Sequence, residues 1–194
     1  QLDEMRLAAI SKYIDLLIRW NARINLTAIR TPEEIVQRHF GESLFAAKDI
    51  LAREPAKTAI DLGSGAGFPG VPFALLAPEV EVTLIESNQK KSTFLKELIY
   101  TLGLKNVKVF GGRAESYSQS AELVMLRAVE RFEEILPLAL KLVSPGGRLA
   151  LLIGTSQIDL AGSQVPAVRW QEPVGIPSGH SRMLLIGTKM VKVE

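Results

Sequence analysis

The chain has 194 residues, of which 47% are hydrophobic and 23% charged, and its formal net charge is +2. This composition is that of an ordinary globular protein with one large core and an appendage, and it leaves little chain for two full domains. The sequence contains no cysteine and two histidines, which excludes a disulfide scaffold, a cysteine metal cluster and a catalytic thiolate, so no metal site is predicted.

Residues 1–54 are predicted to form an N-terminal helical cap. Apolar side chains recur at steps of three and four along residues 2–20, the spacing of an amphipathic helix. A second helix is predicted at about 32–39, because Thr31 offers an N-cap hydroxyl and a proline follows at the first helical position. A third helix is predicted at about 43–53.

Residues 55–194 are predicted to form a Rossmann-like methyltransferase domain in which short apolar strands alternate with helices. The strands are expected at 58–62, 80–85, 107–110, 123–126, 148–153, 167–170 and 183–189, and the helices at 69–77, 88–102 and 132–143. A tight turn is expected at 144–147, and a loop after 153. This alternation is typical of a mostly parallel sheet covered on both faces, so the predicted fold class is α/β with a seven-stranded sheet.

The segment DLGSGAGFPG, residues 61–70, follows the first expected strand and fits two glycine-loop patterns. From Gly65 it matches G-x-G-x-x-G, the dinucleotide fingerprint; from Asp61 it matches D-x-G-x-G-x-G, by which many methyltransferases hold S-adenosylmethionine. In an open parallel sheet, ligands bind at the carboxyl ends of the strands, where this loop lies. Gly63 and Gly65 can take backbone angles closed to other residues, so we expect both to contact the cofactor.

The carboxylates near this loop help to choose the cofactor. Glu86 ends the next expected strand and can accept hydrogen bonds from the ribose hydroxyls of either candidate. Asp61 would repel a pyrophosphate and would suit the ammonium group of S-adenosylmethionine; alternatively, it caps the loop. A Pro-Gly-Gly turn at 145–147 resembles the turn before the fifth strand of class I methyltransferases, and the chain is too short for a dehydrogenase with its own catalytic domain. S-adenosylmethionine is therefore the predicted cofactor.

The loop after the third expected strand, residues 111–115, borders the adenine in this architecture. Glu115 can accept a hydrogen bond from the adenine amino group, and the backbone of Ala114 can bond a ring nitrogen. The alternative is a surface turn that carries an exposed acid.

Absent residues narrow the choice of methyl acceptor. Enzymes that methylate C5 of a pyrimidine use a cysteine nucleophile, which this chain lacks. Enzymes that methylate exocyclic amines usually carry an Asn/Asp-Pro-Pro-aromatic run after the fourth strand, where this chain reads LRAV at 126–129. Ring nitrogens, hydroxyls, carboxylates and small molecules remain as acceptors. A ring nitrogen such as guanine N7 needs only in-line positioning, so no catalytic residue is predicted.

Several short segments carry a family resemblance. They are NLTAI (25–29), RH (38–39), SL (43–44), the glycine loop, TLIES (83–87), KK (90–91), FL (94–95), LGL (102–104), NV (106–107), RAE (113–115) and RA (127–128). Together they resemble the glucose-inhibited division protein B family, bacterial 16S ribosomal RNA methyltransferases that modify a guanine N7 in the decoding-site loop of the small subunit. The resemblance runs from about residue 13 to 152. Glu42 stands where the family usually has aspartate, and Ile153 where it usually has lysine.

The resemblance implies a class I Rossmann-like, S-adenosylmethionine-dependent methyltransferase that acts on 16S ribosomal RNA or on the small ribosomal subunit. The implied cofactor contacts are Gly63, Phe68, Glu86, Ala114, Glu115 and Arg127, with Glu86 on the ribose. From the residues alone, Arg127 lies at the end of the fourth expected strand, where the target would enter. It can contact cofactor, phosphate or base, or form a structural ion pair.

Basic residues are candidates for contacts with RNA phosphates. Lys90 and Lys91 open a helix, where the helix dipole disfavours cations, so they are either contacts for a phosphate partner or two solvated lysines. Arg38 belongs to a group of cap cations that form either an RNA-facing patch or a solvated face. His39 can touch RNA or make a structural hydrogen bond.

Two other classes of function stay open. A class I methyltransferase for a small molecule would need an enclosed apolar pocket instead of basic residues around the cofactor mouth. A non-catalytic RNA-binding or assembly protein would bind RNA with or without the cofactor. No apolar run approaches the roughly 20 residues of a membrane span, and no signal-peptide pattern follows Gln1, so we expect a cytoplasmic monomer without a membrane partner.

Overall fold

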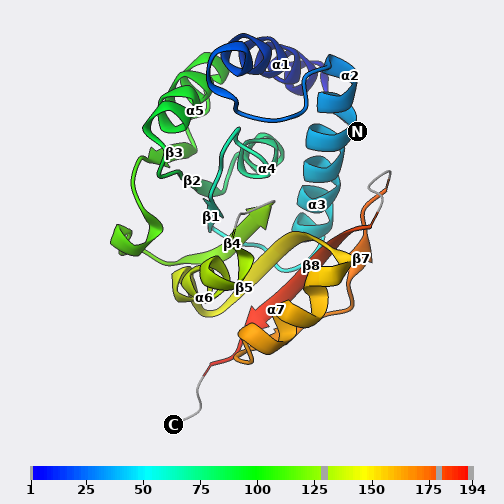
Figure 1. Cartoon of the computed structure of the whole chain (residues 1–194), viewed down its shortest axis with the longest axis vertical. Coiled ribbons are helices and arrows are strands. Elements are labelled where there is room, and N and C mark those ends of the chain that lie inside the picture. The colour runs from blue at the N-terminus through cyan, green and yellow to red at the C-terminus, as the bar shows by residue number, and fades with distance from the viewer. Residues whose placement is uncertain (1, 128–130, 178–180, 192–194) are drawn as a thin grey trace.

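A mixed sheet forms the centre of the chain, which this computed structural model describes for residues 2–127, 131–177 and 181–191. The strands lie in the order β3-β2-β1-β4-β5-β8-β6, with β7 also beside β8 (Figure 1). Strands β1 to β5 are parallel, whereas β8 is antiparallel to β5, β6 and β7. The bounds are β1 Thr58–Leu62, β2 Glu81–Ile85, β3 Val107–Phe110, β4 Ala121–Arg127, β5 Val143–Gly154, β6 Val168–Trp170, β7 Val174–Gly175 and β8 Arg182–Lys189. The predicted α/β class with a mostly parallel sheet is confirmed.

The described part of the sheet has eight strands, so the prediction of seven is wrong by one. The additional strand is β7, two residues long, which pairs with Leu184 and Met183 of β8. Because β5 pairs along the other edge of β8, β6 and β7 share one edge. Pro173 lies between them, and its missing N–H interrupts the ladder. The edge strand is thus broken, and its second piece is too short to show a hydrophobic pattern.

Successive residues of the central strands pack into two hydrophobic cores on opposite faces of the sheet. Ala59 and Leu84 belong to the core on one face, and Ile60 and Ile85 to the core on the other, as the two-residue period of a strand requires. Helices α1, α3, α4 and α5 cover the first face, and α6 and α7 cover the second (Figure 1). Their bounds are α1 Glu4–Ile24, α3 Glu42–Leu51, α4 Gly70–Leu76, α5 Gln89–Leu102, α6 Phe132–Leu142 and α7 Ile158–Gln164.

The N-terminal helices differ from the prediction at one junction. Short helix α2, Pro32–Glu34, begins at the expected N-cap: Thr31 accepts a hydrogen bond from the backbone N–H of Glu34. It continues through π-helix η1, Ile35–Gly41, directly into α3. The expected gap between two helices is therefore wrong, because Gly41 takes ordinary right-handed helical angles. The domain boundary between residues 54 and 55 stays a prediction.

The expected turn at 144–147 is a bulge within β5. Pairing with β4 shifts from Ala121–Val143 to Leu123–Arg148, so four residues of β5 lie opposite one residue of β4. A Cβ on Gly147 would lie 2.9 Å from the carbonyl oxygen of Glu122, which explains why glycine stands there. Helix α7 and 3-10 helix η3, Thr155–Gln157, lie where only a loop was expected.

Candidate functional site

The carboxyl ends of β1, β2 and β4 meet at the point where the strand order reverses. Strand β2 pairs with one edge of β1, and β4 pairs with the other, so the two crossover connections leave in opposite directions. Open α/β sheets bind their ligands in the crevice formed at such a switch point. The glycine loop follows β1, Glu86 follows β2 and Arg127 ends β4, so all three lie at this edge.

The glycine loop is fixed by hydrogen bonds to β2 and α1 and by one of its own, from the hydroxyl of Ser64 to the carbonyl of Asp61. Gly63 and Gly65 have φ angles of 73° and 56°, the left-handed region that favours glycine. The backbone N–H groups of Gly63 and Ser64 both donate to the carbonyl of Ile85, which ties the loop to β2. From the cap, the hydroxyl of Tyr13 donates to the carbonyl of Ala66 at 2.5 Å. The loop therefore depends on both the sheet and α1 for its shape.

Glu86 is the best-anchored carboxylate of the site. One oxygen accepts from the N–H of Gly65 at 2.9 Å, and the other accepts from the N–H of Asn88 at 2.7 Å. The side chain is 7% exposed and lines both cavities described below. Each carboxylate oxygen has a second acceptor site, so Glu86 can still accept from two ligand hydroxyls.

Two cavities open at this edge of the sheet and share Gly63, Glu86, Ser87 and Ile135. The first, named the Glu115 cavity, has a volume of about 420 Å³ and is also lined by Ala114 and Leu138. The second, named the Arg127 cavity, has about 450 Å³ and is also lined by Thr27, His39, Phe68 and Lys91. Both volumes lie within the range of small-molecule sites, and their common wall suits a ligand with two ends.

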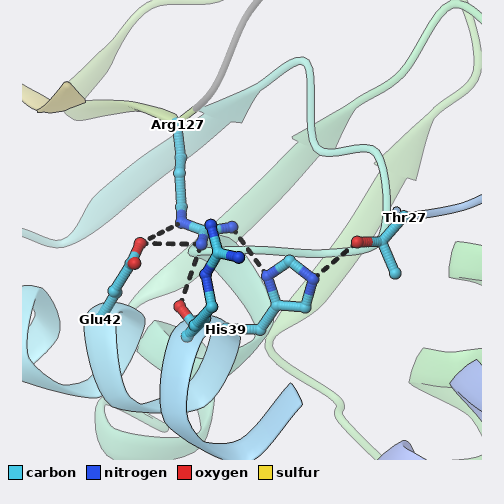
Figure 2. Close-up of polar contacts among 5 residues, drawn as sticks. Thr27, His39, Glu42 and Arg127 are labelled. Carbon is cyan, nitrogen blue, oxygen red and sulfur yellow. Dashed lines mark hydrogen bonds and ion pairs between the residues drawn. The ribbon is translucent and has the colours of Figure 1, made fainter. Parts of the chain in front are cut away.

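Arg127 joins β4 to the cap through a network of hydrogen bonds (Figure 2). Its Nε and Nη2 atoms donate to one oxygen of Glu42 at 3.2 and 2.8 Å, and both side chains of this ion pair are nearly buried. Its Nη2 atom also donates to the backbone carbonyl of Arg38 at 3.0 Å, and its Nη1 atom to Nδ1 of His39 at 3.0 Å. The charge of Arg127 is therefore neutralised by Glu42 within the site.

The same contacts fix the tautomer of His39. A guanidinium has only donors, so Nδ1 must accept, and the ring proton lies on Nε2, which donates to the hydroxyl oxygen of Thr27 at 2.8 Å. The ring stacks on Phe68, with centroids 4.7 Å apart and planes at 15°. Burial and the cations of Arg127 and Arg38 lower the pKa of His39 to about 3, so the ring is neutral at physiological pH.

Asp61 lies beneath the glycine loop. It is fully buried, and one oxygen accepts from the N–H of Gly70 at 3.0 Å, whereas the other has no partner among the described residues. Burial raises the pKa of this carboxyl to about 7. The contact to Gly70 is the loop-capping role that the sequence left open as the alternative to an ammonium site.

The structure brings together most, but not all, of the residues that the sequence singled out. The residues that line one or both cavities are Gly63, Gly65, Phe68, Glu86, Lys91, Ala114, Glu115 and Arg127, whereas Asp61, Arg38 and Lys90 line neither. Arg38 contributes its backbone carbonyl, and its side chain is exposed. Ala128, quoted in the resemblance, lies outside the described residues.

Sequence analysis missed Thr27 and the partnership of Glu42 with Arg127. His39 and Glu42 are three residues apart in one helical run, and this spacing places side chains on the same face of a helix. The sequence therefore could have predicted that these two residues face the same partner. Nothing in the sequence indicated that the face would meet β4, because Glu42 and Arg127 are 85 residues apart.

No helix among the described residues is long and apolar enough to cross a membrane. In the same part of the chain, no three His, Cys, Asp or Glu side chains lie where they could hold a metal ion together.

Comparison with known proteins supports the resemblance on independent grounds. A family model described as rRNA small subunit methyltransferase G (GidB) matches residues 6–168. The chain is 38% identical to "Ribosomal RNA small subunit methyltransferase G" of Chloroflexus aggregans, over 97% of this chain and 84% of that protein. It is also 38% identical to the protein of that name from Myxococcus xanthus, over 77% of this chain and 70% of that one. A SAM dependent methyltransferase from Aquifex aeolicus shares the fold, with a TM-score of 0.63 and 17% identity over 83% of this chain and 94% of that one.

Proposed function

Because the chain belongs to the rRNA small subunit methyltransferase G family, we propose that it transfers the methyl group of S-adenosylmethionine to N7 of a guanine in 16S rRNA. The observation that carries the proposal beyond the family is the position of Glu86. This anchored carboxylate stands at the common wall of two cavities, at the switch point of the sheet.

The residues around the two cavities fit the proposed cofactor. S-adenosylmethionine supplies an activated methyl group when it is bound. Glu86 would hold the ribose, and Ala114 and Glu115 would hold the adenine from the Glu115 cavity. Gly63, Gly65, Phe68 and Arg127 would border the other end of the molecule.

Asp61 is a weaker candidate for a cofactor contact than its position in the sequence suggests, because it is fully buried. It stays a candidate for the ammonium end of the cofactor, and its unpartnered oxygen is a buried acceptor that such a group would satisfy. Its full burial means that the glycine loop would have to move for direct contact.

The Arg127 cavity supports an acceptor that needs no general base. Nδ1 of His39 is already an acceptor for Arg127, and its lowered pKa of about 3 makes it a poor base. Glu86 is occupied by two backbone N–H groups. A guanine N7 carries its lone pair in the ring plane and loses no proton on methylation, so the remaining task of the site is orientation.

Basic residues support RNA over a small neutral substrate. Arg113 lines the Glu115 cavity and Lys91 lines the other, and among the described residues neither forms an ion pair, unlike Arg131 and Arg127. A small neutral substrate would need an apolar enclosure instead. We propose Lys91, with Arg38 and Lys90 on the adjoining surface, as contacts to RNA phosphates. With a ribosomal component as substrate, we expect a cytoplasmic protein, and we expect it to act as a monomer.

The test is transfer of tritium from labelled S-adenosylmethionine to small ribosomal subunits that lack this methylation, followed by digestion of the RNA and identification of the labelled nucleoside. We expect 7-methylguanosine with the wild-type protein and loss of label with Glu86→Ala. Intact cofactor binding by calorimetry without any transfer to RNA would reject the ribosomal substrate and favour a small-molecule methyltransferase.

A further inference from the structure

We propose that His39 is a positioning residue that aims the guanidinium of Arg127 into the Arg127 cavity as a directional hydrogen-bond donor. The inference rests on the proposed function, because the reaction it serves is the methyl transfer argued above. It assigns to the cap a part in the reaction that neither the fold nor the family description specifies.

The guanidinium of Arg127 is almost fully hydrogen-bonded within the protein. Within the described residues, four N–H groups of Arg127 have acceptors, two of them on Glu42, one on His39 and one on the backbone of Arg38. The guanidinium has five N–H groups in all. Its side chain is 8% exposed, and the opposite charge lies 2.8 Å away. A phosphate clamp needs a free charge and an open pair of donors, and this arginine offers neither.

The imidazole of His39 holds one end of this guanidinium. Glu42 and the Arg38 carbonyl hold Nε and Nη2, so Nη1 is fixed by His39 alone among the described residues. An acceptor at this place must be neutral and must present a lone pair, because a protonated ring would face the cation with an N–H group. Thr27 completes the arrangement, since its hydroxyl oxygen can accept the proton that the contact with Arg127 leaves on Nε2.

The ring of His39 is held in place by aromatic stacking. His39 stacks on Phe68, which in turn stacks on Tyr13 with centroids 5.0 Å apart and planes at 8°. Tyr13 donates to the carbonyl of Ala66 in the glycine loop. The ring that holds Arg127 is therefore held by the same stack that supports the loop, so the cap and the loop fix one geometry together.

The experiment compares His39 variants in the tritium-transfer assay on small ribosomal subunits. His39→Phe keeps an aromatic ring against Phe68 and removes both nitrogens, whereas His39→Asn keeps an acceptor near the position of Nδ1. Arg127→Lys and the double variant His39→Phe/Arg127→Lys complete a double-mutant cycle. Thr93→Val is the control, because that hydroxyl bonds only the backbone of Gln89 on an exposed face of α5. Rates are expressed per cofactor-binding site measured by calorimetry.

We expect His39→Phe to lower kcat about tenfold while KM for the subunits changes less than about twofold, and His39→Asn to recover a third or more of the wild-type kcat. The double variant should lie within about twofold of Arg127→Lys, since His39 acts through that residue. The proposal would be overturned if the losses of kcat in the two single variants multiply in the double variant, or if His39→Phe raises KM and retains kcat. Either result would show that His39 touches the substrate itself. A merely structural His39 would lower the melting temperature and leave kcat per binding site unchanged, which would overturn it as well.

If His39→Phe does not fold, Thr27→Val tests the same point, because it leaves the ring in place and removes the partner that holds Nε2 and so orients the ring. We expect its kcat to fall about threefold, and an unchanged kcat contradicts the proposal. A second readout needs no activity: the nitrogen NMR spectrum of the protein, which has two histidines, should place the His39 proton on Nε2 from pH 5 to 8. A proton on Nδ1 would overturn the inference, whereas absence of transfer by the wild-type protein would reject only the proposed function.

Discussion

The Glu115 cavity and the Arg127 cavity share Glu86 but hold their charged groups in different ways. At the Glu115 cavity, Arg131 and Glu134 form an ion pair whose side chains are 77% and 69% exposed. At the Arg127 cavity, the ion pair of Arg127 with Glu42 is 8% and 4% exposed, and three chain segments meet around it. The first arrangement can adapt to a ligand at little cost. The second is rigid before any ligand arrives, as a site that must aim one atom requires.

Loss of the buried ion pair between Arg127 and Glu42 should destabilise the protein far more than loss of the exposed pair between Arg131 and Glu134. Glu42→Ala leaves a buried arginine without its counter-ion, and we expect the free energy of unfolding to fall by about 3 to 5 kcal/mol. The matched control is Glu134→Ala, which breaks the exposed pair and should cost less than about 1 kcal/mol. Urea unfolding at neutral pH measures both, and equal losses would show that the buried pair has no special weight.

Asp61 and His39 should make opposite contributions to the pH dependence of stability, because the pKa of Asp61 is raised to about 7 and the pKa of His39 is lowered to about 3. The folded pKa of Asp61 is raised from 3.8 to about 7 by burial, so the folded state holds the proton more tightly than the unfolded state. The contribution to stability is present below pH 4 and is lost as pH rises to 7, by about 4 kcal/mol at about 1.4 kcal/mol per pKa unit.

Asp61→Asn removes this titration and keeps an acceptor for Gly70. Wild type should therefore lose stability relative to Asp61→Asn between pH 4 and 7 in urea unfolding. Parallel pH profiles of the two proteins would show that folding does not change the pKa of Asp61.

Loss of the shared wall should affect both cavities. Glu86→Ala removes the acceptor for two loop N–H groups and for the proposed ribose contact, and we expect S-adenosylmethionine to bind about 100-fold more weakly. Glu86→Gln keeps one acceptor oxygen and should fall in between. Calorimetry measures the affinity, with the exposed Glu79→Ala as control. If Glu86→Ala binds S-adenosylmethionine as tightly as wild type, the cofactor does not contact Glu86.

A substitution confined to the Glu115 cavity should weaken cofactor binding less than Glu86→Ala does. Glu115 is exposed and, in the proposal, accepts one hydrogen bond from the adenine amino group, so Glu115→Ala should weaken cofactor binding about tenfold. A cofactor analogue without that amino group should bind wild type and Glu115→Ala equally well. If the variant weakens the analogue as much as the parent compound, Glu115 does not read the adenine.

The smallest effect should separate two neighbouring lysines. Lys91 lines the Arg127 cavity and Lys90 does not, although both open α5. Loss of one phosphate contact in Lys91→Ala should weaken RNA binding a few-fold and reduce the slope of log K against log salt by about 0.7 to 0.9. Filter binding at several salt concentrations measures this slope. A larger change for Lys90→Ala would place the RNA path away from the cavity.

Much of the fold followed from local chemistry. The strand at Val107–Phe110 and the stop of α5 at Gly103, which has a φ of 65°, were predicted where they occur, because a short apolar run and a left-handed C-cap are local features. Strand β7 and the continuous passage from α2 to α3 were not, because a two-residue strand and a π-helical turn leave no hydrophobic period to detect.

The candidate site likewise has some features that follow from local sequence and others that depend on tertiary packing. By itself, the sequence determined that a glycine loop and Glu86 follow consecutive parallel strands, and the rules of open α/β sheets then place both at one edge. Only the tertiary structure decided that Asp61 lies beneath the loop and that Glu42, His39 and Thr27 enclose Arg127. The physical reason is that strand order follows from short-range patterns, whereas a buried charge takes its partner from whichever distant segment packs against it.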